Sequence, residues 1–128
     1  TTVIGSAITD LISYYHDYNI DNQSDQLWRL ENYQLRMGDS LYNLKDKYYQ
    51  NSPLQYVEKL QIPVLIWTGK EDYNVNWYQS VYFFMGIKRL GKKAELLLFD
   101  HEGHALKNKT NQQFLSTKIK NWFDTYLK

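Results

Sequence analysis

Two loops of the sequence carry an acid and an imidazole that could act together. Asp72 lies three residues after Gly69, just beyond one apolar run, and His104 lies five residues after Phe99, where a second apolar run ends. A carboxylate that accepts a hydrogen bond from a histidine ring N–H fixes the ring tautomer. The histidine can then act as general base toward a hydroxyl group and as general acid toward a leaving group. Taken alone, each residue is read more simply as an ordinary loop residue.

Other residues in the same two loops could take these roles. Glu71 and Asp100 are competing acids that rank below Asp72, and His101 is an alternative base. One conceivable metal site would use three residues of the second loop, His101, Glu102 and His104. It lacks a convincing third ligand, so we expect no metal. His16 lies in a tyrosine-rich segment and is interpreted as incidental.

A nucleophile to match this acid and base is missing from the chain. No G-x-S-x-G motif occurs. Ser6 follows a glycine, but it lacks the second glycine and is expected inside a strand rather than at its end. The sequence also has no phosphate-binding glycine loop and no dinucleotide fingerprint, so we expect no cofactor.

The elements that would position these loops follow from the apolar pattern. Strands are expected at residues 1–7, 62–68 and 94–99, and the second is a continuous apolar run of the kind buried on both faces. Helices are expected at residues 25–37, 44–50, 54–60, 77–90 and 111–127. Residues 8–22 are interpreted as a loop that can hold a short helix.

Capping residues set the expected helix ends. Ser24 and Asn43 are predicted N-caps, and Ser52 before Pro53 is a sharper start signal because proline fits the first helical position. Gly38 and Gly91 are predicted helix terminators. The order of strand, helices, strand, helix, strand, helix predicts a parallel sheet with crossover connections. Neighbouring parallel strands lie about 4.8 Å apart, so the Asp72 and His104 loops are expected at one sheet edge.

Composition narrows the class of protein. The chain has 128 residues and is 43% hydrophobic, which suits one ordinary domain with a real core. Fifteen Lys and Arg residues nearly balance fourteen Asp and Glu residues, so neither nucleic acid nor an anionic membrane is an expected partner. No cysteine is present, which excludes disulfides and thiolate zinc sites and leaves the compartment open. No apolar run approaches the roughly 20 residues that span a bilayer.

Six short segments stand out by their order and spacing: Ser52-Pro53-Leu54, Pro63-Val64-Leu65-Ile66, Gly69 through Asp72 to Val75, Lys88-Arg89-Leu90-Gly91-Lys92, Glu102-Gly103-His104 and Trp122-Phe123-Asp124. Together they resemble the C-terminal part of the prolyl oligopeptidase family of serine peptidases, most of all its dipeptidyl-peptidase and acylaminoacyl-peptidase branches. A weaker match extends back to the opening strand, so the resemblance covers nearly the whole chain.

The resemblance implies an α/β-hydrolase domain in which serine, aspartate and histidine follow in chain order. Carried over by position, Asp72 corresponds to the triad acid and His104 to the triad base, while Asn74 and Val75 fall in the family's D-x-x-V loop. The triad serine corresponds to nothing in the chain, so residues 1–128 are expected to be the C-terminal part of a peptidase domain. The nucleophile half and any β-propeller would lie upstream of Thr1.

We therefore expect a serine exo- or oligopeptidase that acts on peptides, and we expect the 128-residue chain alone to be inactive. An esterase or thioesterase of the same fold, or a non-catalytic binding module, is the alternative. The residues that contact substrate are not assigned. The opening strand is expected to expose an unpaired edge, which would pair with a second copy, a swapped segment or the missing N-terminal half.

Overall fold

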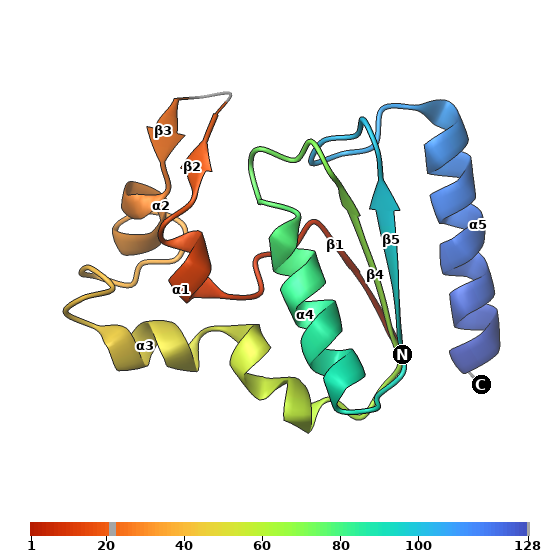
Figure 1. The fold of residues 1–128 in the computed structure, drawn as a ribbon, viewed down its shortest axis with the longest axis horizontal. Helices are drawn as coiled ribbons and strands as arrows, with labels where there is room; N and C mark the ends of the chain where they lie inside the picture. Colours follow the sequence, from red (N-terminus) through yellow and green to blue (C-terminus); the bar gives the residue numbers. More distant parts are fainter. Residues whose placement is uncertain (21–22, 128) are drawn as a thin grey trace.

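Three parallel strands form the centre of the structure, a computed structural model that describes residues 1–20 and 23–127 (Figure 1). The strands are β1 (Thr2–Gly5), β4 (Val64–Gly69) and β5 (Ala94–Phe99). Their order in the sheet is β1–β4–β5, and both pairings are parallel. The central strand β4 is the most buried of the three, which explains its continuous apolar sequence. The predicted parallel sheet is confirmed.

Helices cover both faces of this sheet (Figure 1). On one face, the helix α4 (Tyr78–Arg89) and the 3₁₀ segment η1 (Pro53–Lys59) pack against alternate strand residues. The buried centre of that cluster consists of Val64, Ile66, Phe83 and Ile87. On the other face lies α5 (Lys109–Tyr126). Its cluster is centred on Phe99, Leu106 and Leu115, with Trp67 and Leu97 packed against them. The two-residue period of the strands thus divides the sheet's apolar side chains between two cores.

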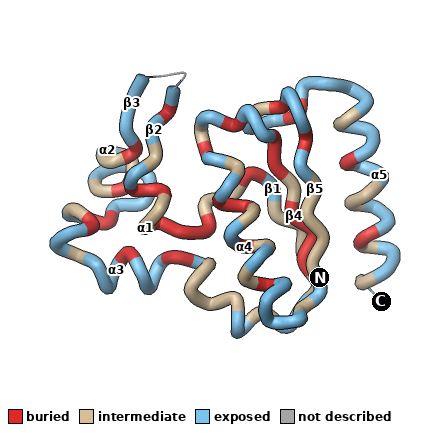
Figure 2. The backbone as a smooth tube through the Cα atoms, in the orientation of Figure 1, coloured by how far each residue is buried: buried red, intermediate tan, exposed pale blue. Residues whose placement is uncertain are grey.

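The segment between β1 and η1 builds a small helical part with its own core. It contains α1 (Leu11–Tyr14), α2 (Leu27–Glu31), α3 (Lys45–Gln50) and an antiparallel pair, β2 (Tyr18–Asn19) with β3 (Ser24–Asp25). Figure 2 shows buried positions gathered where these helices meet. The buried residues of this core are Leu11, Tyr14, Tyr15, Leu30, Met37, Leu41, Tyr48 and Val75. The last of them comes from the loop after β4, so the helical core reaches the Asp72 loop.

Three tyrosines, Tyr14, Tyr15 and Tyr48, are buried in the helical core. The rings of Tyr15 and Tyr48 meet edge to face, with centroids 5.5 Å apart. The Tyr15 hydroxyl donates to Oε1 of Glu31 at 2.7 Å. Burial and this bond raise the pKa of Tyr15 to about 12, so its hydroxyl remains a neutral donor. Tyr15 and Tyr48 therefore stabilise this core through both ring packing and hydroxyl hydrogen bonds.

A buried glutamine joins the helical part to the sheet layer. Oε1 of Gln79, on α4, accepts from the backbone N–H groups of Thr9 at 3.0 Å and Asp10 at 2.8 Å. Its Nε2 donates to Oγ of Ser13 on α1 at 2.9 Å. These bonds satisfy buried backbone donors in the segment that leaves β1, which would otherwise be costly to bury.

The helix predicted at residues 25–37 is wrong in most of its length. Ser24 belongs to β3 instead of capping a helix, and α2 ends at Glu31. Leu30 is fully buried in the core. Leu35 is 40% exposed, so burial of its side chain does not favour a longer helix. The chain returns instead as a loop in which the N–H of Gly38 donates to the carbonyl of Glu31 at 2.8 Å. Gly38 has φ +90°, so it ends this loop and not a long helix.

The remaining boundaries agree with the prediction to within two residues, but two caps do not. The side chain of Asn43 donates to Asp39 at 3.1 Å, and α3 begins after Leu44 without a side-chain cap. Ser52 does precede the 3₁₀ segment, yet its hydroxyl makes no capping bond there. It accepts from the N–H of Leu11 at 2.9 Å and donates to the carbonyl of Tyr48 at 2.8 Å, linking α1 to α3. Residues 8–20 hold α1 and β2, while Asp21 and Asn22 of the predicted loop lie outside the described residues.

Candidate functional site

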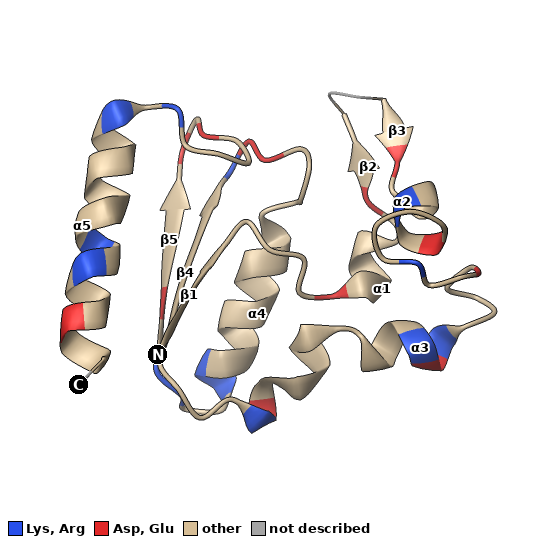
Figure 3. Ribbon diagram, turned by 180° about the vertical axis from the view of Figure 1, so that it is seen from behind, with Lys and Arg blue, Asp and Glu red and all other residues tan. Residues whose placement is uncertain are grey.

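The loops after β4 and β5 meet at the carboxyl edge of the sheet. Gly69 and Phe99, the last residues of the two strands, are paired in the ladder. Figure 3 shows acidic positions gathered in these two loops. The N–H of Lys70 donates to the carbonyl of Phe99, and the N–H of Glu71 donates to the carbonyl of Glu102, both at 2.9 Å. The strand pairing therefore continues into the loops and fixes how they face each other.

Asp72 and His104 are brought into direct contact at this edge. Nδ1 of His104 lies 2.8 Å from Oδ2 of Asp72. The Asp72 side chain is fully buried, whereas the His104 side chain is 48% exposed. Oδ1 of Asp72 accepts from the N–H groups of Asn74 at 3.0 Å and Val75 at 2.9 Å. Both carboxylate oxygens are thus engaged, and the acceptor at Nδ1 selects the tautomer in which Nε2 carries the free lone pair.

The competing residues named from the sequence are paired elsewhere. Nδ1 of His101 lies 3.0 Å from Oε1 of Glu71, and both side chains are largely exposed. Asp100 makes a 2.7 Å ion pair with Nζ of Lys70. That cation lowers the pKa of the Asp100 carboxyl. Exposed pairs of this kind hold a loop only weakly.

Two further histidine hypotheses concern His16 and the conceivable metal site. Both ring nitrogens of His16 have partners in the helical part, the carbonyl of Ile12 at 3.0 Å and the hydroxyl of Tyr42 at 3.1 Å. Within residues 1–20 and 23–127, no group of three or more His, Cys, Asp or Glu residues is placed to hold a metal ion.

Ser6 lies just past the end of β1 and not inside the strand as expected, because β1 ends at Gly5. Its φ of +43° is the left-handed conformation that breaks the strand. Its hydroxyl oxygen is buried, and it makes no hydrogen bond to any described residue, His104 included. Ser6 is therefore not joined to the Asp72–His104 pair.

Gly69 allows the two loops to approach each other. A Cβ on Gly69 would lie 2.1 Å from the carbonyl oxygen of Glu102 and 2.3 Å from that of Gly103, far inside van der Waals contact. The left-handed conformation in the second loop is at His101, with φ +57°, and Gly103 is outside that region.

Glu102 is a site residue that sequence reasoning used only as a conceivable metal ligand. Its side chain accepts from the N–H groups of Lys107 at 2.6 Å and Asn108 at 3.0 Å, and from Nδ2 of Asn111 at 2.8 Å. These donors lie at the start of α5, so Glu102 closes the loop that carries His104 onto that helix. In the sequence, this role is indicated by an acidic residue a few positions before the polar start of a helix.

The same bonds, chiefly that from the Lys107 N–H, lower the pKa of the Glu102 carboxyl below its usual 4.5. A carboxyl with a lowered pKa in the folded state binds its proton more readily when unfolded, so stability rises with pH in this range. We expect the stabilisation to be complete above about pH 4.5 and to be lost as the pH falls through the folded-state pKa. Urea midpoints measured between pH 7 and pH 3 should show a smaller acid loss in Glu102→Gln than in wild type. Equal pH slopes would contradict this role.

The helical part holds the Asp72 loop from the other side. Nη1 of Arg29 donates to Oδ1 of Asn74 at 2.9 Å. The Tyr14 hydroxyl lies 3.0 Å from Oε1 of Gln26 and 3.3 Å from the carbonyl of Asn74. Val75 is buried in the helical core. The two bonds to Asn74 were not visible from the sequence, because they join positions 45 and 60 residues apart.

An open cleft of about 520 Å³ lies over the pair. It is lined by both loops, including Asp72, Asn74 and His104, and by Asn19 of the β2–β3 pair. This volume is in the usual range for small-molecule sites. No helix among the described residues is long and apolar enough to cross a membrane.

Comparisons with known proteins agree with this architecture. Residues 2–128 match the model of the prolyl oligopeptidase family. Dipeptidyl-peptidase 4 of Giardia intestinalis is 29% identical over 80 residues, 62% of this chain and 10% of that protein. The acylamino-acid-releasing enzyme of Mus musculus is 28% identical over 87 residues, 66% of this chain and 12% of that protein.

The solved structure of an acylaminoacyl peptidase in complex with Z-Gly-Gly-Phe-chloromethyl ketone superposes with a TM-score of 0.80 at 21% identity, covering 98% of this chain and 20% of that one. The fold is thus the C-terminal portion of an α/β-hydrolase, and the chain spans only about a tenth to an eighth of the length of the curated relatives named above. With the family model matched over residues 2–128, the chain belongs to the prolyl oligopeptidase family of serine peptidases.

Proposed function

We propose that this chain supplies the aspartate and histidine of a Ser-Asp-His triad that hydrolyses peptide bonds. The observation that carries the proposal is the 2.8 Å contact between Nδ1 of a half-exposed His104 and Oδ2 of a fully buried Asp72. An acid held away from water can orient the imidazole and stabilise the imidazolium that forms in turnover. Nε2 of His104, the ring nitrogen that is not bound to Asp72, would act as the general base.

In the proposed reaction, Nε2 of His104 removes the proton from a serine hydroxyl while the serine oxygen attacks the peptide carbonyl. The resulting imidazolium, stabilised by Asp72, donates that proton to the leaving amine, and an acyl-enzyme forms. His104 then activates a water molecule, whose attack releases the acid product and the serine. We propose that the serine belongs to a segment N-terminal to Thr1, because no G-x-S-x-G motif occurs in the 128 residues.

The sheet offers a place for such a segment. β1 lies at the edge of the sheet and pairs only with β4 among the described strands. We propose that the outer edge of β1 pairs with another strand, from the N-terminal part of the same domain or from a second copy. An edge strand left with unpaired N–H and C=O groups is a template for such pairing.

Active-site labelling with a fluorophosphonate probe tests this function. We expect the probe to label the intact protein at one serine outside residues 1–128 and to leave the 128-residue chain unlabelled. Aminoacyl-anilides and short-chain esters, compared as substrates of the intact protein, separate a peptidase from an esterase. Labelling of the 128-residue chain alone, lost in His104→Ala, would show instead that the nucleophile is internal.

A further inference from the structure

A second, smaller pocket lies on the other side of the Asp72 loop from the cleft over His104. Its volume is about 160 Å³. An apolar cavity of about 150 Å³ is large enough for benzene, so this pocket can admit the end of one side chain. Asp72, Tyr73 and Asn74 line both the pocket and the cleft. A peptide lying in the cleft could therefore place one group across this loop and into the pocket.

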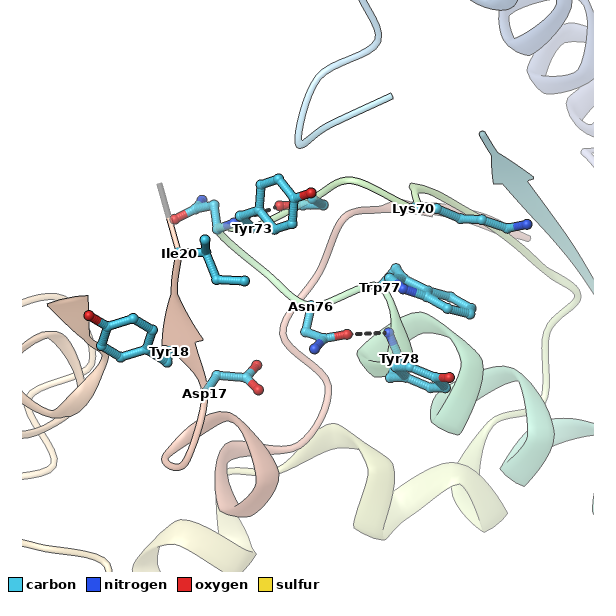
Figure 4. Close-up of a pocket in the computed structure, with 10 residues that line it drawn as sticks. Asp17, Tyr18, Ile20, Lys70, Tyr73, Asn76, Trp77 and Tyr78 are labelled. Atoms are coloured by element: carbon cyan, nitrogen blue, oxygen red, sulfur yellow. Dashed lines mark hydrogen bonds between the residues drawn. The ribbon is translucent and has the colours of Figure 1, made fainter. Parts of the chain in front are cut away.

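Asp17 is the acidic residue of the pocket that has no ion-pair partner within residues 1–20 and 23–127. It lies between α1 and β2, and Figure 4 shows its carboxylate pointing toward Asn76 across the pocket. Its Oδ2 atom is buried and has no hydrogen-bond partner among residues 1–20 and 23–127. Burial raises the pKa of the Asp17 carboxyl, so its charge lacks the solvation that water gives. A buried carboxylate oxygen without a donor is costly unless a ligand supplies one.

The nearby cations of the protein do not supply this donor. Lys70 lines the pocket, but its Nζ makes the ion pair with Asp100, and in Figure 4 its side chain extends away from Asp17. Arg29 is occupied by Gln34 and Asn74. His16, the neighbour of Asp17 in the sequence, has both ring nitrogens bonded in the helical part.

Aromatic side chains line the same pocket as the acid. Tyr18, Tyr73, Trp77 and Tyr78 line the pocket. The rings of Trp77 and Tyr78 are stacked, with centroids 4.2 Å apart. Aromatic faces attract cations and also pack against methylene chains. An acid beside aromatic faces is thus suited to a group with an apolar stem and a cationic end.

We propose that this pocket binds a cationic nitrogen group of the peptide substrate, as the guanidinium or ammonium of a basic side chain or as a free amino terminus, with Asp17 as its counter-ion. This proposal rests on the proposed peptidase function, because it takes the bound peptide to be the substrate. It adds the class of peptide that the site selects. A neutral residue in the same position would leave the buried Asp17 oxygen unpaired. Selectivity would therefore come from the cost of that unpaired acceptor.

Three small probes separate the two sources of the cation. N-acetyl-arginine amide carries its charge on the side chain, citrulline amide carries it on the amino terminus, and N-acetyl-citrulline amide carries none. We expect one of the first two to bind the intact protein about tenfold to hundredfold more tightly than the third, the range for a hydrogen-bonded charge. Calorimetry gives the dissociation constants, and the tighter probe identifies the source. Equal affinities for all three would overturn the proposal.

Variants of Asp17 test whether this residue causes the preference for the charged probe. In Asp17→Asn, which keeps the size of the side chain, we expect the preference for the charged probe to fall to about twofold or less, while Asp124→Asn, an exposed control on α5, keeps it. Asp17→Ser is the second variant if the first does not fold. A preference that survives in both Asp17 variants would show that the cation binds elsewhere.

His104→Ala separates this inference from the function on which it rests. We expect that variant to lose turnover and to keep the probe preference. Turnover that survives in His104→Ala would sink the proposed function and leave the pocket's charge preference intact, whereas lost turnover with equal probe affinities would sink the inference alone.

Discussion

Asp72→Asn in the intact protein should lower kcat by about 10⁴-fold, the loss that the same change causes in a serine-protease triad. The structure gives the reason. Oδ1 of Asp72 accepts from two backbone N–H groups, those of Asn74 and Val75. In the variant, the amide oxygen must occupy that position, because an NH₂ group there would face two donors. The NH₂ group then faces Nδ1 of His104 and forces the proton onto Nε2, so the imidazole cannot remove a proton from serine.

The measurement is kcat and KM with a fluorogenic peptide, and the control is Asp100→Asn. Asp100 was a competing acid in the sequence, but its exposed carboxylate pairs with Lys70 and does not contact His104. We expect the control to stay within about twofold of wild type, since exposed ion pairs contribute little. A kcat for Asp72→Asn within tenfold of wild type would mean that Asp72 does not set the tautomer of the catalytic base.

Gly69→Ala should destabilise the domain by about 3 kcal/mol or more and should reduce activity together with stability. The new methyl group would sit 2.1 Å from the carbonyl oxygen of Glu102, which is backbone and cannot rotate away. The two loops would have to separate, and the bond from the N–H of Glu71 to that same carbonyl would be lost. Separation at this point also moves the histidine loop away from Asp72.

Gly103→Ala, on the facing loop, is a matched control. Its Cβ would meet only the carbonyl oxygen of Glu71, at an ordinary 3.5 Å, and its backbone needs no left-handed conformation. We expect a change in unfolding free energy of about 1 kcal/mol or less, which is usual for a substitution that creates no clash. Urea unfolding followed by tryptophan fluorescence compares the two variants. Equal midpoints would argue that the loops are not held together at Gly69.

The sheet was predictable because its strands are locally distinctive. The run from Val64 to Trp67 is apolar throughout, and a proline precedes it, so adjacent residues indicate both the burial of the strand and where it begins. Parallel pairing of β4 with β5 follows from the single helix between them. The meeting of the two loops at one edge then follows from the topology, whereas the assignment of Asp72 and His104 as triad acid and base came from the family resemblance.

The helical part was less predictable because its structure depends on distant partners. Residues 25–37 have the leucines and the flanking polar residues of a helix, yet Leu30 and Met37 are buried in a core that residues from α1, α3 and the β4–α4 loop complete, and Leu35 is exposed. Local propensity cannot report such a core. The same holds for Ser52, whose hydroxyl bridges two helices that the sequence separates by about forty positions. The unpartnered Oδ2 of Asp17 is likewise a product of tertiary burial.

The burial of Val75 in the tyrosine-rich core has a consequence for local unfolding. Val75, one of the two residues that donate a backbone N–H to Asp72, is at the same time a core residue of the helical part. If α1 to α3 open while the sheet stays folded, the acid loses its anchor without any change in β4 or β5. Sub-global openings of this kind cost less free energy than complete unfolding. The stability of the helical part therefore limits the fraction of molecules in which the histidine is oriented.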